Sequence, residues 1–269
     1  MAQCLSIGVF DSGFGGLTVL KALLEVIPSA NYLYFGDTAR LPYGSKSAET
    51  VAKYAVEAGC FLHQQGAQML VVACNTATAL ALDKITQSVS IPVVGVVEPG
   101  AKRAAAASKK GKAVVIGTEA TISSHAYLKA LRSLGVKARE KACPLLVPLV
   151  EEGWLEHEVT EQVARIYLGE AFSDGFESAD VLVLGCTHYP LIKPLLRRLA
   201  PPRVTVVDSA ESTAHVVKDL LTDSPKHEEK HSPPSLRFFA TDSVEKFQRL
   251  GARFLDRSIR NVHHVDLKE

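Results

Sequence analysis

The sequence predicts an α/β protein built around parallel sheets. Two apolar runs support this, QMLVVACNTA at 68–77 and VLVLGCTHYP at 181–190, because each stops at a cysteine followed by amide, hydroxyl or imidazole side chains. Each run is too short for a lone helix and too uniformly apolar for a strand with one face in water, which indicates buried parallel strands. Ligands bind beyond the carboxyl ends of such strands. Cys74 and Cys186 could therefore face one small molecule from two domains.

The composition is that of an ordinary globular protein. The chain has 269 residues, 47% of them hydrophobic, which is enough for two domains. Thirty basic residues balance twenty-nine acidic ones, so no overall field attracts nucleic acid or an anionic membrane surface. No apolar run reaches the ~18 residues that span a bilayer, and the first ten residues lack the order of a signal peptide. With five cysteines and no C-x-x-C pair, we expect a cytoplasmic protein with reduced thiols.

The first part of the chain alternates strands and helices. The predicted elements are strands over 5–10, 32–35, 68–73 and 93–97, and helices from 17, over 48–65, from 75 and from 98. Between the first strand and helix lies the glycine-rich turn DSGFGG at 11–16, a ready anion cradle because backbone N–H groups converge on a helix N-terminus. It is a poor match to the dinucleotide fingerprint, since the third glycine of G-x-G-x-x-G falls on Thr18.

The second part repeats this plan. The predicted elements are a strand over 113–117, a helix through 134, an irregular apolar segment over 144–154, a helix over 157–172, a strand ending at Cys186, a strand over 204–207, a helix from 208 to 221, a loop over 222–235, a strand and helix within 236–255, and an edge strand from 262. The echo of the opening strand and turn indicates two half-molecules of similar plan.

The two cysteines have more than one possible role. At a strand end that leads into a helix, nearby N–H donors stabilise a thiolate, so either thiol could act as a base. Buried cysteines also serve as small apolar side chains. A zinc site made of Cys74, Cys186 and His188 has suitable ligand types, but it lacks the C-x-x-C knuckle of most structural zinc sites.

Four further residues carry groups that could move or hold a proton. His188 is a natural proton partner for Cys186, or a hydrogen-bonded histidine beside a turn. Asp11 could belong to the site or cap the following helix. The pair Glu151 and Glu152 could take part in chemistry or lie in solvent.

Seven motifs, in this order, resemble the glutamate racemase family: DSGFGG at 11–16, FGD at 35–37, PYG at 42–44, ACNTAT at 73–78, GTEAT at 117–121, EEG at 151–153 and GCTHYP at 185–190. The ACNT and GCTHYP pair is typical of the wider aspartate/glutamate racemase superfamily, and DSGFGG with PYG points to the glutamate branch.

The resemblance implies two Rossmann-like or flavodoxin-like domains with mainly parallel sheets and an active site in the cleft between them. Residues 1–97 and 208–269 would form the first domain and 98–207 the second. A homodimer is expected. The N-terminal extension of family members that require a cell-wall precursor as activator is not expected in this chain.

The resemblance also implies a reaction, the racemisation of L-glutamate to D-glutamate by two bases without a cofactor or metal, supplying D-glutamate for bacterial peptidoglycan. Cys74 and Cys186 would be the acid/bases, with Asp11, Glu152 and His188 near the thiols. Substrate contacts would come from Asp11, Ser12, Tyr43, Gly44, Asn75, Thr76, Thr121, Thr187 and His188.

Three alternatives remain open at this point. A racemase for aspartate or a related amino acid differs in substrate by a methylene, which a pocket discriminates by only ~1–3 kcal/mol. A hydrolase or transferase would use one cysteine with His188 as its base and leaves the second cysteine unexplained. A non-catalytic amino-acid binding module would keep the cleft and make both thiols incidental.

Overall fold

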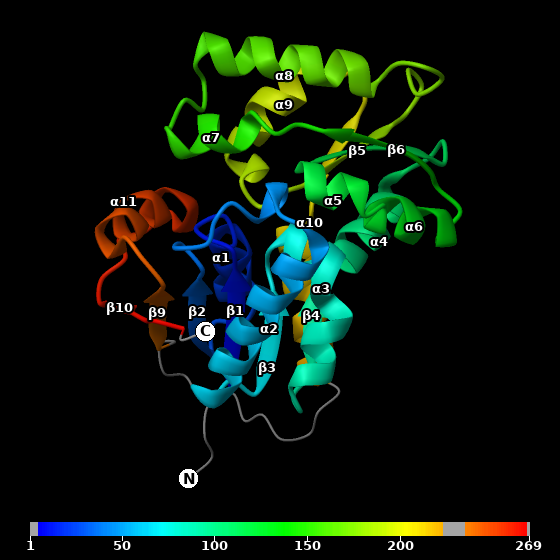
Figure 1. The fold of residues 1–269 in the computed structure, drawn as a ribbon. Helices are drawn as coiled ribbons and strands as arrows, with labels where there is room; N and C mark the ends of the chain where they lie inside the picture. The colour runs from blue at the N-terminus through cyan, green and yellow to red at the C-terminus, as the bar shows by residue number, and fades with distance from the viewer. Residues whose placement is uncertain (1–4, 223–234, 268–269) are drawn as a thin grey trace.

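Two parallel sheets form the framework of the protein, seen in the lower and upper halves of Figure 1. The structure is a computed structural model that describes residues 5–222 and 235–267. The first sheet has the strand order β10-β9-β2-β1-β3-β4 and the second the order β6-β5-β7-β8. The strands are β1 (Ser6–Asp11), β2 (Asn31–Gly36), β3 (Met69–Val72), β4 (Val93–Gly95), β5 (Lys112–Gly117), β6 (Lys137–Ala142), β7 (Val181–Gly185), β8 (Thr205–Asp208), β9 (Leu236–Ala240) and β10 (Val262–His264). Every pairing in both sheets is parallel, so the α/β prediction is confirmed.

Helices cover both faces of each sheet. On the first sheet, α1 (Leu17–Val26), α10 (Ser209–Thr222) and α11 (Val244–Leu255) cover one face, and α2 (Ala48–Gln64) and α3 (Asn75–Ser88) the other. On the second sheet, α4 (Val97–Ala107) and α6 (Ala126–Ser133) cover one face, and α8 (Glu158–Ala171) and α9 (Lys193–Leu199) the other. The shorter elements are α5 (Glu119–Ser123), α7 (Leu146–Glu151) and the 3₁₀ turns Tyr43–Ser45 and Tyr189–Ile192.

The two cysteine strands lie inside their sheets, as predicted. Every residue of β3 and of β7 is buried, because side chains on both faces pack under helices. Strands of this kind need apolar residues at each position rather than at alternate ones. Cys74 and Cys186 follow at the carboxyl ends, where both are buried.

The late strands join the first sheet, where β9 pairs with β2 and β10 with β9. In Figure 1 this brings the orange and red strands beside the blue ones. The predicted edge strand from 262 is therefore confirmed. The domain boundaries themselves stay a prediction, and β8 ends at Asp208, one residue beyond the predicted second domain.

The structure differs from the sequence predictions in four elements. The charged edge strand β6 was not predicted, because its residues KAREKA are only half-buried and show no apolar run. The helix predicted through 134 is two helices, since His125 is left-handed with φ 55°. The segment over 144–154 contains α7, whose first turn accommodates Pro148 because N–H groups there need no helical partner. The strand predicted over 93–97 stops at Gly95.

Two features are absent from the ranges 5–222 and 235–267. No helix there combines the length and apolar composition that a bilayer crossing needs. In the same ranges, no three His, Cys, Asp or Glu side chains converge as a metal ion would require. The predicted loop over 222–235 lies almost wholly outside the described residues, as does Cys4.

Candidate active site

A cavity of about 380 Å³ separates the carboxyl ends of β3 and β7. This volume falls within the ~300–1,000 Å³ typical of small-molecule sites. Both Cys74 and Cys186 border it, so the structure brings the two thiols to one cavity. The full lining is Ser12, Gly13, Phe14, Leu41, Pro42, Tyr43, Gly44, Ser45, Cys74, Asn75, Thr76, Thr118, Glu119, Pro144, Val147, Pro148, Glu151, Cys186, Thr187 and His188.

Cys74 is the N-cap of α3. Its Sγ accepts a hydrogen bond from the Ala77 N–H at 3.4 Å and lies 3.6 Å from Ser12 Oγ. Burial and then the charge of Asp11 raise the pKa of Cys74 to about 12, although the contacts with Ala77 and Ser12 act in the other direction. Cys74 is thus protonated at neutral pH, and the Ala77 N–H and the Ser12 hydroxyl are already placed to stabilise the thiolate that forms when it loses a proton.

Cys186 stands at one end of a proton-bearing chain with His188 and Glu151. Its Sγ lies 3.8 Å from His188 Nδ1, and His188 Nε2 lies 3.1 Å from Glu151 Oε1. Burial by itself lowers the pKa of His188, but the contacts with Cys186 and Glu151 raise it to about 10. Burial raises the pKa of Glu151, and the hydrogen bond and charge of His188 outweigh this and lower it. At neutral pH the chain holds an imidazolium beside Cys186.

The structure places Glu151, not Glu152, in this chain. Glu152 is exposed and does not border the cavity, whereas Glu151 is half-buried and borders it. The reason is helical geometry: consecutive residues at the end of α7 point about 100° apart, so only one of the pair faces His188. The expected role of Glu152 near a thiol therefore passes to its neighbour.

Asp11 lies behind the cavity rather than on its wall. Its side chain is buried, Oδ2 accepts from the Gly13 N–H at 2.9 Å, and Oδ1 has no partner among the described residues. Burial raises the pKa of Asp11, and the charge of His188 and backbone N–H groups act in the other direction. Asp11 can reach the chemistry through these neighbours, so direct substrate contact, which the resemblance implied, is not what this geometry favours.

Three threonine hydroxyls join the two sheets at the cavity. Thr76 Oγ1 lies 2.9 Å from Thr118 Oγ1 and 3.1 Å from Thr121 Oγ1, and the last two are 2.9 Å apart. Thr121 is fully buried and does not border the cavity. Thr118 borders it and was not singled out from the sequence, although its place just after β5 follows the same strand-end rule that found the cysteines.

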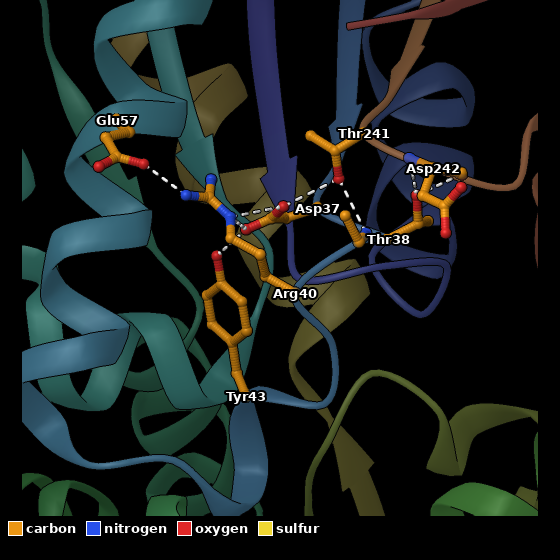
Figure 2. A network of polar contacts seen from close by, with 8 residues as sticks. Asp37, Thr38, Arg40, Tyr43, Glu57, Thr241 and Asp242 are labelled. Carbon is orange, nitrogen blue, oxygen red and sulfur yellow. Dashed lines mark hydrogen bonds and ion pairs between the residues drawn. The ribbon is translucent and has the colours of Figure 1, made fainter. Parts of the chain in front are cut away.

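Tyr43 borders the cavity, but its hydroxyl forms a hydrogen bond with a buried carboxylate outside the cavity lining. Figure 2 shows it donating to Asp37, which also accepts from Arg40 Nε at 2.8 Å and from Thr241 Oγ1 at 2.9 Å. Asp37 is completely buried. This network anchors the turn 41–45, so Tyr43 and Gly44 can offer a substrate their backbone N–H groups rather than the phenol.

The glycine-rich turn and the second cysteine loop touch directly. A methyl group at Gly15 would lie 2.3 Å from Thr187 Oγ1 and 2.6 Å from His188 Nδ1. Thr18 Oγ1 also donates to the Thr187 carbonyl at 3.2 Å. Only glycine lets the first turn approach so closely, so the turn shapes the second half of the site instead of serving only as an anion cradle.

Comparison with known proteins supports one family. Residues 8–217 match the profile of the family described as Asp/Glu/Hydantoin racemase. A glutamate racemase of Koribacter versatilis (strain Ellin345) is 58% identical, with 97% of each chain covered, and one of Geobacter metallireducens is 47% identical, with 98% of this chain and 97% of the relative covered.

Solved structures of glutamate racemases are similar to this fold over nearly the whole chain. Glutamate racemase isoform RacE1 from Bacillus anthracis gives a TM-score of 0.92 at 39% identity, covering 99% of both chains. Glutamate racemase from Francisella tularensis, solved in complex with D-glutamate, gives 0.90 at 34% identity, covering 98% of both. The fold of two parallel sheets accordingly has full-length counterparts, and the chain belongs to the Asp/Glu/Hydantoin racemase family.

Proposed function

We propose that this chain is a glutamate racemase that interconverts L- and D-glutamate without a cofactor. The observation that carries the proposal is the placement of Cys74 and Cys186 at the ends of strands from two different sheets, on one small cavity. The relatives of 58% and 47% identity bear this name, and the similar structure from F. tularensis was solved with D-glutamate.

Two thiols on one cavity suit the inversion of an α-carbon. One thiolate removes the α-proton from one face, and the other thiol returns a proton to the opposite face. After a turnover, the first cysteine holds the proton taken from the substrate and the second is a thiolate, so the two protonation states have exchanged. A single base would have to reach both faces, for which a fixed side chain is poorly placed.

In a reaction without a cofactor, the protein itself must stabilise the negative charge of the carbanion. As the proton leaves, negative charge grows on the adjacent carboxylate, and fixed donors in a site closed to water are effective there. The proposed substrate contacts are Ser12, Asn75, Thr76, Thr187, His188 and the backbone of Tyr43 and Gly44, all of which border the cavity. Thr121 supports Thr76 and Thr118 from behind.

The charged groups beside the thiols have distinct proposed roles. The His188 imidazolium, held by Glu151, stabilises negative charge on Cys186 or gives up a proton to it. The N-terminus of α3 and the Ser12 hydroxyl stabilise negative charge on Cys74. Asp11 tunes both from behind the cavity, since its charge opposes ionisation of Cys74 and favours the charged form of His188.

The wider setting of the enzyme is part of the proposal. We infer a cytoplasmic homodimer that supplies D-glutamate for bacterial peptidoglycan, with the first domain formed by 1–97 and 208–269 and the second by 98–207. The family resemblance supports these points.

Racemisation by the purified protein tests the function. Dialysed protein is incubated with L-glutamate, with no cofactor added, and optical rotation is followed; it should fall to zero. A response to L-aspartate alone would keep the family and change the substrate. No response to either would favour the binding module, whereas an acyl-enzyme burst with an ester would favour the hydrolase. Cys74→Ser and Cys186→Ser should each lose racemisation, and full activity in either variant overturns the two-base scheme.

A further inference from the structure

The amide of Asn75 has one end bonded and the other end free. Its Oδ1 accepts a hydrogen bond from the Tyr127 hydroxyl at 2.7 Å. Its Nδ2 is buried and has no partner among the described residues. Asn75 is the first residue of α3 and borders the cavity next to Cys74. A buried N–H donor without an acceptor is costly, so the placement of this donor beside the cavity favours a ligand that brings an acceptor.

Tyr127 reaches Asn75 from the other sheet. It lies in α6, packs with the second-sheet core, and is fully buried. Burial raises the pKa of its hydroxyl, so the group stays protonated and can only be a donor or neutral acceptor at physiological pH. Its position against α4 depends on Gly100, where a methyl group would lie 3.1 Å from the hydroxyl oxygen.

A bonded Oδ1 fixes which end of the amide remains available. With the carbonyl oxygen facing Tyr127, the NH₂ group is left for the substrate, and it can bind an acceptor such as a carboxylate oxygen. With the amide reversed, its carbonyl oxygen would be left instead and would repel a carboxylate. The direction of one amide therefore decides whether this wall of the cavity attracts an anionic substrate.

We propose that Tyr127 is a positioning residue, which holds the Asn75 amide with Nδ2 available to a carboxylate oxygen of the substrate. The identity of the substrate, glutamate, rests on the function proposed above. The hydrogen bond crosses from the second sheet to the first, so this binding group is set correctly only when the two halves of the site are in register.

Kinetics and binding of a Tyr127→Phe variant test the proposal. KM for L-glutamate, and the Kd of D-glutamate by titration calorimetry, should both rise roughly three- to tenfold, the range for one lost neutral hydrogen bond. The value of kcat should stay within about twofold, because the Asn75 amide is still present and the variant lowers only the fraction of the protein that holds it in the binding orientation. In an Asn75→Ala background, which removes the oriented group, Tyr127→Phe should add less than about twofold.

Two further variants separate positioning from a merely structural role. Tyr32→Phe removes another buried hydroxyl, which donates to Leu23 and Ile27 carbonyls away from the cavity, and should leave KM and Kd unchanged. Asn75→Asp keeps an acceptor for Tyr127 but replaces Nδ2 by oxygen. It should weaken binding more than Asn75→Ala does.

Three results would overturn the inference while leaving the proposed function intact. One is wild-type racemisation with unchanged KM and Kd in Tyr127→Phe; another is an equal effect of Tyr127→Phe in both Asn75 backgrounds. Tolerance of Asn75→Asp would show that the opposite end of the amide faces the substrate and would overturn it too. A wild-type protein that neither binds nor converts glutamate would overturn the proposed function and this inference together.

Discussion

Glu151 holds His188 on the side of the imidazole opposite Cys186. Glu151 Oε1 lies 3.1 Å from His188 Nε2, and His188 Nδ1 lies 3.8 Å from Cys186 Sγ. The ring also packs edge-on against Phe254, with ring centroids 5.1 Å apart. Because both nitrogens are engaged and the ring packs against Phe254, the histidine has one orientation, and its charge is kept beside the second thiol.

Exchanging Glu151 for Gln should reduce kcat/KM by at least about tenfold, because a neutral amide no longer stabilises the imidazolium that serves Cys186. Glu152→Gln is the matched control, since it changes the neighbouring exposed carboxylate in the same way, and kcat/KM should stay within about twofold. Steady-state racemisation with both glutamate isomers measures this. Equal losses in the two variants would contradict the assignment of Glu151.

The raised pKa of His188 predicts how stability depends on pH. A group whose pKa is higher in the folded state stabilises it fully below the unfolded value, here 6.5, and loses that effect as pH rises through the folded value of about 10. The free energy of unfolding should thus fall between about pH 7 and 10, and fall less in Glu151→Gln. Urea titrations of both proteins across this range give the slopes; identical slopes would show that Glu151 does not raise the pKa of His188.

Gly15→Ala should cost about 100-fold in kcat/KM, because its methyl group would lie 2.3 Å from Thr187 Oγ1 and displace the loop that carries Cys186. Gly169→Ala is the contrasting substitution. It lies in α8 with nothing within 4 Å of the new methyl group, so it should stabilise the protein by about 0.5–1 kcal/mol and leave activity unchanged. Kinetics and thermal unfolding of the pair distinguish a steric effect at the site from a general effect of alanine, and an active Gly15→Ala would refute the close contact.

Arg40→Lys should destabilise the protein by about 1–3 kcal/mol and raise KM severalfold, because lysine cannot bridge Asp37 and Glu57 while lying over the Tyr54 ring. The turn 41–45 that this network anchors borders the cavity. Arg165→Lys, in an exposed pair with Glu161, should change stability by no more than about 0.5 kcal/mol. Denaturant unfolding and KM values test both variants. If Arg40→Lys changes stability and KM as little as Arg165→Lys does, Arg40 does not anchor the turn 41–45.

The sequence was sufficient to predict the parts of the fold that depend on hydrophobic patterning. The uniformly apolar runs before Cys74 and Cys186 require strands buried on both faces, and their carboxyl ends mark the site. Strand β6 was not predicted because an edge strand needs no apolar run. It forms because its backbone pairs with β5. The break at His125 between α5 and α6 was not predicted either, because a left-handed residue does not change the apolar periodicity of the sequence around it.

The site was predictable at strand ends and less so elsewhere. Ser12, Asn75 and Thr187 follow strand ends and border the cavity as expected. The choice between Glu151 and Glu152 depends on the rotation of α7 against His188, and the commitment of the Tyr43 hydroxyl depends on Asp37, Arg40 and Thr241 meeting across the fold. The spacing of residues within a short segment does not predict such tertiary contacts.

The central claim, that two thiols work on opposite faces of one carbon, is tested most directly by where deuterium goes. L-Glutamate is converted in deuterated water and stopped at low conversion, and α-deuterium is measured separately in the D-glutamate formed and the L-glutamate recovered. Two bases predict deuterium in the product and almost none in the recovered substrate, because the proton delivered comes from a thiol exchanged with solvent. Product that keeps its original proton, or equal deuterium in both pools, would contradict the account.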